Sequence, residues 1–282
     1  MPELPEVETM RRGILGAVGG KIVTVDKIRC RKKPIEITPT LSAIRKRVAG
    51  KTVVDIDRIG KRVVIGLGKQ HVSEFLVFEP RMTGLVLVAS PPTQEHLRFG
   101  LTLGNCDVNQ ILYWDRRGLG KIRLLNPQEL GEQLGPLRVG PDALKITLDE
   151  LVQRFSGSNR EIKVALLDQK LIAGVGNLYA SELLHAAKIH PQTPCSQLKR
   201  SEFRKIHAQM LNILKTAIQY EGSTLADGTY RNALNQQGGY QNRHLVYDRA
   251  GQPCNQCHQS KIARIVQAQR STFYCRRCQK AR

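Results

Sequence analysis

Two Cys-x-x-Cys pairs near the C-terminus constrain the fold more than any other feature of this sequence. Seventeen residues separate the two pairs, and this spacing falls within the range of zinc ribbons. Such pairs bring four thiolates to one tetrahedral Zn²⁺ and form a closed structural site. A redox-active pair or a coincidence of spacing are the alternatives. We therefore expect one structural zinc ion, with the ligands Cys254, Cys257, Cys275 and Cys278.

The other three cysteines, which make an odd total of seven, are scattered at positions 30, 106 and 195. This usage indicates a reduced, cytoplasmic protein and not a disulfide scaffold. The N-terminus lacks a basic segment followed by an apolar core, so we expect no signal peptide. No apolar run reaches the length of about 18 residues that a membrane span requires.

The charge balance is strongly basic, with 44 Lys and Arg residues against 24 acidic residues, a net charge of +20. Segment 243–282 alone carries nine Lys or Arg residues against Asp248. Such a balance favours a polyanionic partner, and nucleic acid before membrane because no basic amphipathic anchor is evident. The weaker alternatives are a charge that serves only solubility, or a basic protein of the ribosomal kind.

The first half of the chain consists of short alternating segments separated by turn residues. Regular spacing of this kind is typical of a β-sandwich or a partly open barrel. We predict strands at 21–28, 52–59, 62–67, 75–78, 84–88, 97–103, 111–114 and 121–125, with a short helix at 41–48.

Beyond a Gly- and Pro-containing connection at 126–142 the periodicity becomes helical. We predict helices at 147–155, 161–169, 177–187 and 200–219, followed by a long loop at 222–242 that is either functional or mobile. The expected division is an N-terminal domain at 1–135, a linker at 136–146, a helical domain at 147–242 and a zinc-finger hairpin at 243–282.

The N-terminal residues PELPEVET carry a candidate nucleophile. If Met1 is removed, Pro2 presents a secondary amine, and an α-amino group has a pKa of roughly 7.7–8.0, far below that of lysine. Such an amine can attack a carbonyl or a sugar C1′ to give an iminium. Glu3 beside it is a candidate for proton transfer. A disordered terminus with two prolines is the alternative.

Residues 166–182 form a second candidate site, in which one helix ends near Gly174 and Asn177 caps the next. The backbone N–H groups of such a turn bind phosphate well. An ordinary helix–turn–helix corner is the alternative.

Three stretches, PELPEVET at 2–9, KLIAGVGNLYASELLHAAKIHP at 170–191 and QRSTFYCRRCQK at 269–280, resemble bacterial formamidopyrimidine-DNA glycosylases. Their order and spacing match over essentially the whole chain. The resemblance implies an α+β multidomain fold. An N-terminal β-sandwich with a leading helix precedes a helix–two-turn–helix domain with a C-terminal zinc finger, and DNA lies in the cleft between.

The same resemblance implies a monomeric base-excision repair enzyme that removes 8-oxoguanine and formamidopyrimidines from double-stranded DNA. Pro2 would form a Schiff base at C1′, and Glu3 would transfer protons at the sugar. A β,δ-elimination would follow. Lys61 and Arg270 would support catalysis by holding phosphate. The other implied DNA contacts are His96, Arg117, Lys170 and Asn177, and the implied residue behind the lesion pocket is Glu6.

Base extrusion leaves a gap that the family fills with a Met, an Arg and a Phe. Met82 and Arg117 match the first two, but Leu119 replaces the Phe and Gly118 stands where a basic residue is more common. Leucine can wedge between bases, although it offers a smaller stacking surface.

Two alternatives remain. An endonuclease VIII-like enzyme for oxidised pyrimidines usually has Gly after the first Glu, and Leu4 favours the purine enzyme. A non-catalytic DNA-binding protein of the same fold would not need Pro2 and Glu3.

Overall fold

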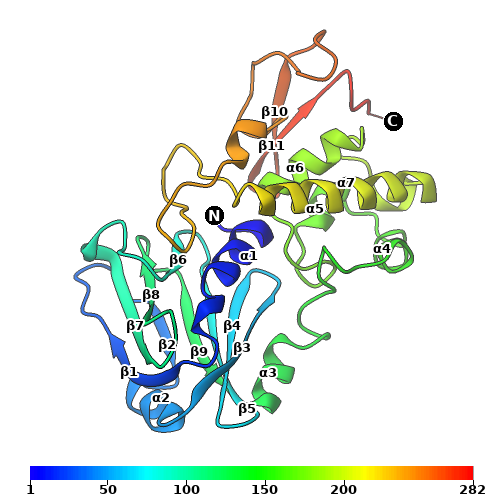
Figure 1. The fold of residues 1–282 in the computed structure, drawn as a ribbon. Helices are drawn as coiled ribbons and strands as arrows, with labels where there is room; N and C mark the ends of the chain where they lie inside the picture. The colour runs from blue at the N-terminus through cyan, green and yellow to red at the C-terminus, as the bar shows by residue number, and fades with distance from the viewer. Residues whose placement is uncertain (282) are drawn as a thin grey trace. The chain divides into compact units, whose positions relative to one another are not determined.

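The computed structural model describes residues 1–281, which form two compact units (Figure 1). The first unit contains Met1–Arg138 together with Ile218–Gln241, and the second contains Val139–Ala217 together with the chain from Asn242 onward. Segment 218–241 therefore groups with the N-terminal residues although it follows the helical region. The four-part division drawn from the sequence stays a prediction.

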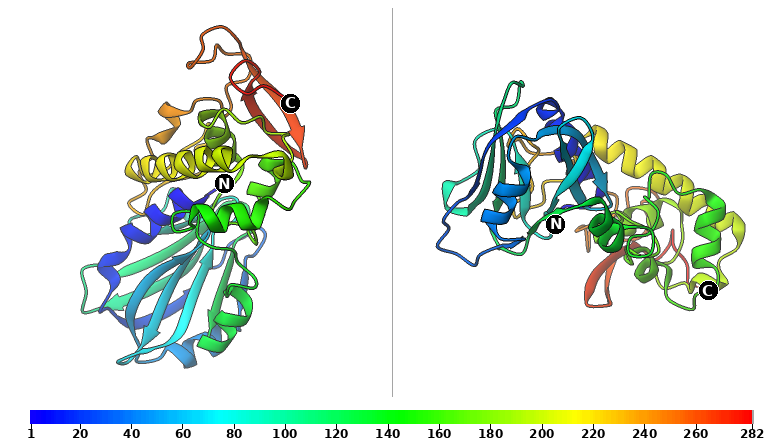
Figure 2. Two further views of the ribbon diagram at one scale, coloured as in Figure 1. Left: turned by 90° about the vertical axis from the view of Figure 1, so that its right-hand side faces the viewer. Right: turned by 90° about the horizontal axis from the view of Figure 1, so that it is seen from below.

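A single nine-stranded sheet forms the body of the first unit, in the order β2-β9-β5-β4-β3-β1-β7-β8-β6. All neighbouring pairs are antiparallel except β2 and β9. Figure 2 shows these strands side by side. Their bounds confirm the predicted strands and add β2: β1 (Lys21–Lys27), β2 (Glu36–Thr38), β3 (Thr52–Ile59), β4 (Arg62–Gly68), β5 (Val72–Glu79), β6 (Gly84–Leu87), β7 (Leu97–Gly104), β8 (Gln110–Asp115) and β9 (Lys121–Leu125).

Aromatic contacts show that this sheet folds back on itself. Three strands separate β5 from β7, which would place them about 19 Å apart in a flat sheet. Yet the ring of Phe78 on β5 lies 5.9 Å from that of Phe99 on β7 and 5.7 Å from that of Tyr113 on β8. The two halves of the sheet therefore pack face to face around one hydrophobic core, which is the sandwich predicted from the sequence.

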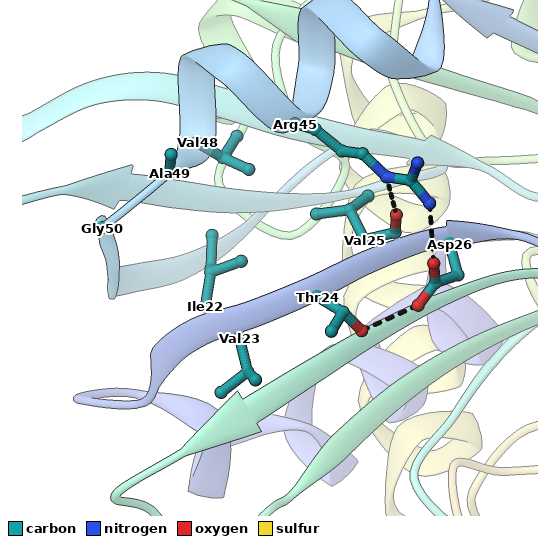
Figure 3. A pocket seen from close by; sticks show the side chains of 9 residues that line it. All are labelled: Ile22, Val23, Thr24, Val25, Asp26, Arg45, Val48, Ala49 and Gly50. Carbon is teal, nitrogen blue, oxygen red and sulfur yellow. Dashed lines mark hydrogen bonds and ion pairs between the residues drawn. The ribbon is translucent and has the colours of Figure 1, made fainter.

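The leading helix α1 (Leu4–Gly13) packs its apolar side chains Val7 and Met10 into this core. A 3₁₀ turn η1 (Leu15–Ala17) follows it, and α2 (Leu41–Val48) packs against β1 and β2. There a pocket of about 370 Å³ is bordered by Arg45, which donates to the carbonyl of Val25 and to Asp26 (Figure 3).

The helix α3 (Pro127–Leu134) lies within residues 126–142, which the sequence predicts to be a connection without a helix, and that prediction is wrong here. A capping box marks its start, in which Glu129 accepts the N–H of Asn126 and Asn126 accepts the N–H of Glu129, at 2.7 and 2.8 Å. Together with Pro127 at the first helical position, this pattern was visible in the sequence.

The second unit is helical and ends in a hairpin. Its elements are α4 (Leu148–Phe155), α5 (Ile162–Leu166), α6 (Asn177–Ala186), the 3₁₀ turn η3 (Cys195–Gln197), α7 (Arg200–Gln219), whose end belongs to the first unit, and the strands β10 (Ile262–Gln267) and β11 (Arg270–Cys275). The predicted helix at 161–169 was too long. It ends at Leu166 because the Asp168 carboxylate accepts the N–H of Lys170 at 2.9 Å and turns the chain.

Two short 3₁₀ turns complete the described elements, η2 (Gln94–His96) in the first unit and η4 (Tyr240–Arg243). No helix within residues 1–281 has the length and apolar character needed to cross a membrane.

Candidate active site and nucleic-acid interface

The N-terminal segment is held at the start of α1. Pro2 and Glu3 are buried, and Glu3 is the N-cap residue of the helix. One oxygen of the Glu6 carboxylate accepts the backbone N–H of Glu3 at 2.9 Å. The terminus predicted to be catalytic is therefore fixed by the first helical turn, and the alternative of a disordered terminus is wrong.

The second oxygen of Glu6 reaches the long loop that follows α7. It accepts the backbone N–H of Ser223 at 2.9 Å. Gly222 adopts φ +79°, and a Cβ at this position would lie 2.9 Å from two Glu6 side-chain atoms, so only glycine fits. Burial raises the pKa of Tyr230, whose hydroxyl donates to the carbonyl of Glu221 at 2.9 Å. This part of the loop thus forms one wall around Glu6.

Glu8 anchors the other side of α1. It accepts hydrogen bonds from Arg11, Arg12 and Arg58, at 2.9–3.0 Å. Burial alone would raise the pKa of Glu8, but the three guanidinium groups outweigh it and lower the pKa to about 2. Arg58 also donates to the carbonyl of Gly60 at 2.9 Å, so this cluster links α1 to the β3–β4 turn.

Lys61 lies in that turn and is half-buried. Gly60 before it adopts φ +56°, a conformation that glycine tolerates best. Because Arg58 contacts both Glu8 and Gly60, the position of Lys61 depends on the same ion-pair cluster that holds α1.

The loop that carries Arg117 and Leu119 is built around Asp115, which is fully buried. The Asp115 carboxylate accepts the hydroxyl of Thr83 at 2.5 Å and the N–H groups of Arg117 and Gly120 at 3.1 and 2.8 Å. Met82 precedes Thr83, so this network brings the two predicted gap-filling segments together. Sequence reasoning missed Asp115 as their organiser.

The exposure of these side chains fits their predicted task. Met82 and Arg117 are exposed, whereas Leu119 is half-buried. Gly118 adopts φ +60°, and a Cβ there would lie 2.2 Å from the carbonyl oxygen of Lys33. The absence of a basic residue at position 118 therefore has a local cause, because no side chain fits against the 28–35 segment.

His96 is the last residue of η2, directly before β7, and its side chain is mostly buried. Its ring packs edge-on against Trp114, with 5.4 Å between centroids, and its Nε2 lies 3.7 Å from the Glu95 carboxylate. Nδ1 is buried and has no hydrogen-bond partner within residues 1–281.

In the second unit, Asn177 connects three elements. Its Nδ2 donates to the carbonyl of Ser271 on β11 at 2.9 Å, and its Oδ1 accepts from Lys163 on α5 at 2.5 Å. The prediction that Asn177 caps α6 was wrong: Gly176 is the N-cap, because the Asn177 amide is committed to these partners. Sequence reasoning missed the fully buried Lys163.

This bond brings the predicted phosphate residues of the second unit into one region. Arg270 is exposed and directly precedes Ser271, whose carbonyl Asn177 holds. Lys170 is exposed in the turn between α5 and α6. An exposed lysine and an exposed arginine near the start of α6 are suited to binding a phosphodiester.

The four predicted zinc ligands converge. Their Sγ atoms all lie within 4.8 Å of one another, with 3.9 Å between Cys254 and Cys278 and 3.7 Å between Cys257 and Cys275. A tetrahedron with Zn–S bonds of about 2.3 Å has S···S edges of about 3.8 Å, so the cluster fits one Zn²⁺. The strands β10 and β11 form the hairpin between the two pairs.

Glu182 on α6 secures this finger to the helical unit. Its buried carboxylate accepts the N–H groups of three consecutive residues, Leu245, Val246 and Tyr247, at 2.8–2.9 Å. Burial raises the pKa of Glu182, and these three donors oppose the rise. The helix that begins at Asn177 therefore also positions the start of the finger segment.

Comparisons with known proteins agree along the whole chain. Three family models match: the formamidopyrimidine-DNA glycosylase N-terminal domain at 1–122, the formamidopyrimidine-DNA glycosylase H2TH domain at 137–228, and a zinc finger found in FPG and IleRS at 251–281. The formamidopyrimidine-DNA glycosylase of Chloroflexus aurantiacus is 38% identical over 99% of this chain and 98% of its own. That of Bacillus subtilis is 36% identical over 99% of both.

Solved structures of similar proteins have the same fold. Lactococcus lactis Fpg in complex with DNA containing an abasic site has a TM-score of 0.85 at 30% identity, covering 99% of this chain and 100% of that one. MutM (Fpg) from Thermus thermophilus has a TM-score of 0.84 at 32% identity, covering 99% and 98%.

Proposed function

The chain belongs to the formamidopyrimidine-DNA glycosylase family, and we propose how its own residues perform the reaction of that family. The protein is a base-excision repair DNA glycosylase and abasic-site lyase that acts on oxidised purines in double-stranded DNA. It works as a monomer, with one structural zinc ion held by the four C-terminal cysteines.

Pro2 is the proposed nucleophile. Its nitrogen forms a peptide bond while Met1 is present and becomes a secondary amine only after Met1 is removed. The amine attacks C1′ of the damaged nucleotide; the N–C1′ bond forms as the glycosidic bond breaks, and the departing base takes a proton. Opening of the sugar ring leaves an iminium on the proline nitrogen.

The iminium then acts as an electron sink. Loss of a proton from C2′ expels the 3′ phosphate in β-elimination, and a second proton loss expels the 5′ phosphate in δ-elimination. Glu3 stands next to Pro2 and is the proposed group for these proton transfers. Its burial at the start of α1 supports this role, because a fixed carboxylate needs no reorganisation at each step.

Glu6 and its partner loop are the proposed lesion pocket. The Glu6 carboxylate fixes both Glu3, beside the nucleophile, and Ser223 in the loop that follows α7. One side chain therefore ties the proposed catalytic end of α1 to the proposed base-recognition segment. This connection is the observation that carries the proposal.

The gap left by the extruded base is assigned to Met82, Arg117 and Leu119. Exposure of Met82 and Arg117 and their common support by Asp115 and Thr83 favour this assignment. A guanidinium can donate to the acceptors of the orphaned cytosine. Phosphate binding is assigned to Lys61, His96, Lys170, Asn177 and Arg270.

We further propose that the protein acts in the bacterial cytoplasm on the nucleoid. None of the seven cysteines forms a disulfide within the described chain, which fits a reducing compartment.

Single-turnover cleavage of matched duplexes tests the substrate assignment. We expect rapid cleavage of 8-oxoguanine and formamidopyrimidine opposite cytosine, and much slower cleavage of thymine glycol opposite adenine. The reverse order would favour the endonuclease VIII-like alternative. Cleavage of none of the three, by protein that still binds an abasic-site analogue, would favour a non-catalytic DNA-binding protein.

A further inference from the structure

We propose that the first unit has an additional binding site for a phosphate group, formed by Arg98 and the basic segment between β1 and β2. The site lies outside the proposed lesion pocket, and no step of the glycosylase reaction uses its residues. Its centre is a buried arginine that forms no ion pair with any acidic residue among residues 1–281.

Arg98 lies on β7 and is only 2% exposed. Its Nε donates to the backbone carbonyl of Asp115 at 2.9 Å. The Nη1 and Nη2 atoms are buried and have no hydrogen-bond partner among residues 1–281. A guanidinium stays protonated under all physiological conditions and carries five N–H donors, so four donors of a buried cation are unused. Leaving the donors of a charged group unsatisfied costs more free energy than leaving those of a neutral group unsatisfied.

The carboxylates of Asp115 and Glu95 have other hydrogen-bond or ion-pair partners. The Asp115 side chain already accepts from the Thr83 hydroxyl and from two backbone N–H groups. Glu95 pairs with Lys32 at 3.2 Å. Within the described part of the chain, no ion pair joins Arg98 to any acidic residue, so an external anion is the natural counter-ion.

A pocket of about 280 Å³ lies beside Arg98. Besides Arg98, its lining includes the cations Lys27, Arg29 and Lys32, and no acidic residue. Lys27, Arg29 and Lys32 are exposed and can adjust to a ligand, whereas Arg98 is fixed by Asp115. A rigid planar donor set flanked by mobile cationic side chains suits a tetrahedral oxyanion, and phosphate before carboxylate because it offers more acceptor oxygens.

The site adjoins the loop that the proposed function uses to face the orphaned base. The carbonyl oxygen of Lys33, in the same basic segment, packs so closely on Gly118 that no Cβ fits. Arg98 supports the start of that loop through the Asp115 carbonyl. Binding of a phosphate would therefore stabilise the basic segment between β1 and β2 in its observed position. Through that segment it would also stabilise the loop that carries Arg117.

Thermal unfolding in sodium phosphate tests the site without any enzymatic readout. Wild-type protein, Arg98→Met, Lys32→Ala and the control Lys46→Ala are compared in phosphate and in chloride of equal ionic strength. We expect phosphate to raise the Tm of wild type and of Lys46→Ala. The rise should be smaller in Lys32→Ala and smallest in Arg98→Met.

Lys32 is exposed, so its variant is expected to fold even if Arg98→Met does not. The proposal would be overturned if phosphate raises the Tm of Lys32→Ala as much as that of wild type, while Arg98→Met either shows the same rise or does not fold. The experiment measures binding of phosphate alone. Absence of this binding would leave the proposed glycosylase activity untouched, and absence of glycosylase activity would leave the phosphate site untouched.

The salt dependence of DNA binding identifies the source of the phosphate. If the site takes a phosphate of the DNA backbone, Lys32→Ala should make the negative slope of log K against log salt shallower. The expected difference from Lys46→Ala is about 0.9. If the slope is unchanged while the phosphate-induced Tm shift is still reduced, the site takes a free phosphate or a phosphorylated small molecule. Both results support a phosphate site.

Discussion

The carboxylate of Glu6 accepts the backbone N–H of Ser223 at 2.9 Å and so joins two residues that are 217 positions apart in the chain. The other oxygen of the same carboxylate holds Glu3. Two N–H donors therefore converge on one anionic group. A glutamine in its place would present one acceptor and one donor, and its amide would oppose one of the two N–H groups.

We therefore predict that Glu6→Gln lowers the single-turnover glycosylase rate on 8-oxoguanine duplex by tenfold or more. Hydrogen bonds to charged groups contribute about 1.5–3 kcal/mol, and tenfold in rate corresponds to about 1.4 kcal/mol. The lyase rate on a preformed abasic site should fall less. Glu150→Gln, in the exposed capping box of α4, is the matched control. Equal losses in both reactions would place the role of Glu6 in folding alone.

The Glu8 cluster predicts a pH dependence of stability. The pKa of Glu8 is about 2 in the folded protein and 4.5 as its ordinary value, so the unfolded state binds a proton first as the pH falls. The stabilisation is present in full above about pH 5 and disappears as the pH falls toward 2; a shift of this size corresponds to about 3 kcal/mol. The free energy of unfolding of wild type minus that of Glu8→Gln should shrink over this range. A difference that stays constant from about pH 6 to about pH 2.5 would contradict the account.

The zinc site predicts a coupled loss of metal and DNA affinity. Cys275→Ser should release zinc, since three thiolates bind it less tightly than four, and the hairpin that carries Arg270 should lose its order with the metal. Elemental analysis and binding to an abasic-analogue duplex measure the two effects. Cys106→Ser, which changes a cysteine outside the cluster, should retain one zinc per chain. Zinc at full occupancy in Cys275→Ser would remove Cys275 from the ligand set.

Gly118→Ala should disturb the loop that faces the orphaned base. The new Cβ would meet the Lys33 carbonyl in a residue with φ +60°, and strain of this kind costs about 1–3 kcal/mol. We expect a lower Tm and a slower glycosylase step. Gly131→Ala, at a helical glycine with no atom near its Cβ position, is the control and should not lower the Tm. If Gly118→Ala is as stable and as active as wild type, the segment that contains Lys33 moves aside without a measurable cost in free energy.

Leu119→Phe should raise the glycosylase rate, because an aromatic ring stacks on a base for roughly 1–3 kcal/mol and leucine has no stacking face. Leu119 is half-buried, so part of this gain will be offset by repacking. Arg117→Ala should lower the same rate. Both substitutions should matter little on a preformed abasic site. A comparable change in the lyase rate would assign these residues to the fold or to general DNA binding.

The sequence sufficed for features that are local in the chain. Alternation along 52–125 predicted the strands, and the spacing of the four cysteines predicted the metal cluster, because each depends on neighbouring residues alone. The start of α3 was also readable from Asn126 and Glu129.

The features that the sequence did not reveal depend on long-range packing. The Asp115 network requires Thr83, and the Asn177 amide meets Lys163 and Ser271 only in the folded unit. Neither arrangement leaves a periodic pattern in the sequence, so the sequence predicts candidate site residues but not the contacts that hold them.

The most direct test of the account is borohydride trapping on a duplex with one 8-oxoguanine opposite cytosine, followed by mass spectrometry of the cross-linked peptide. We expect one adduct on the peptide that begins at Pro2, and no adduct in protein that retains Met1. An adduct on an internal lysine such as Lys61, formed with undiminished yield in Pro2→Gly, would contradict it.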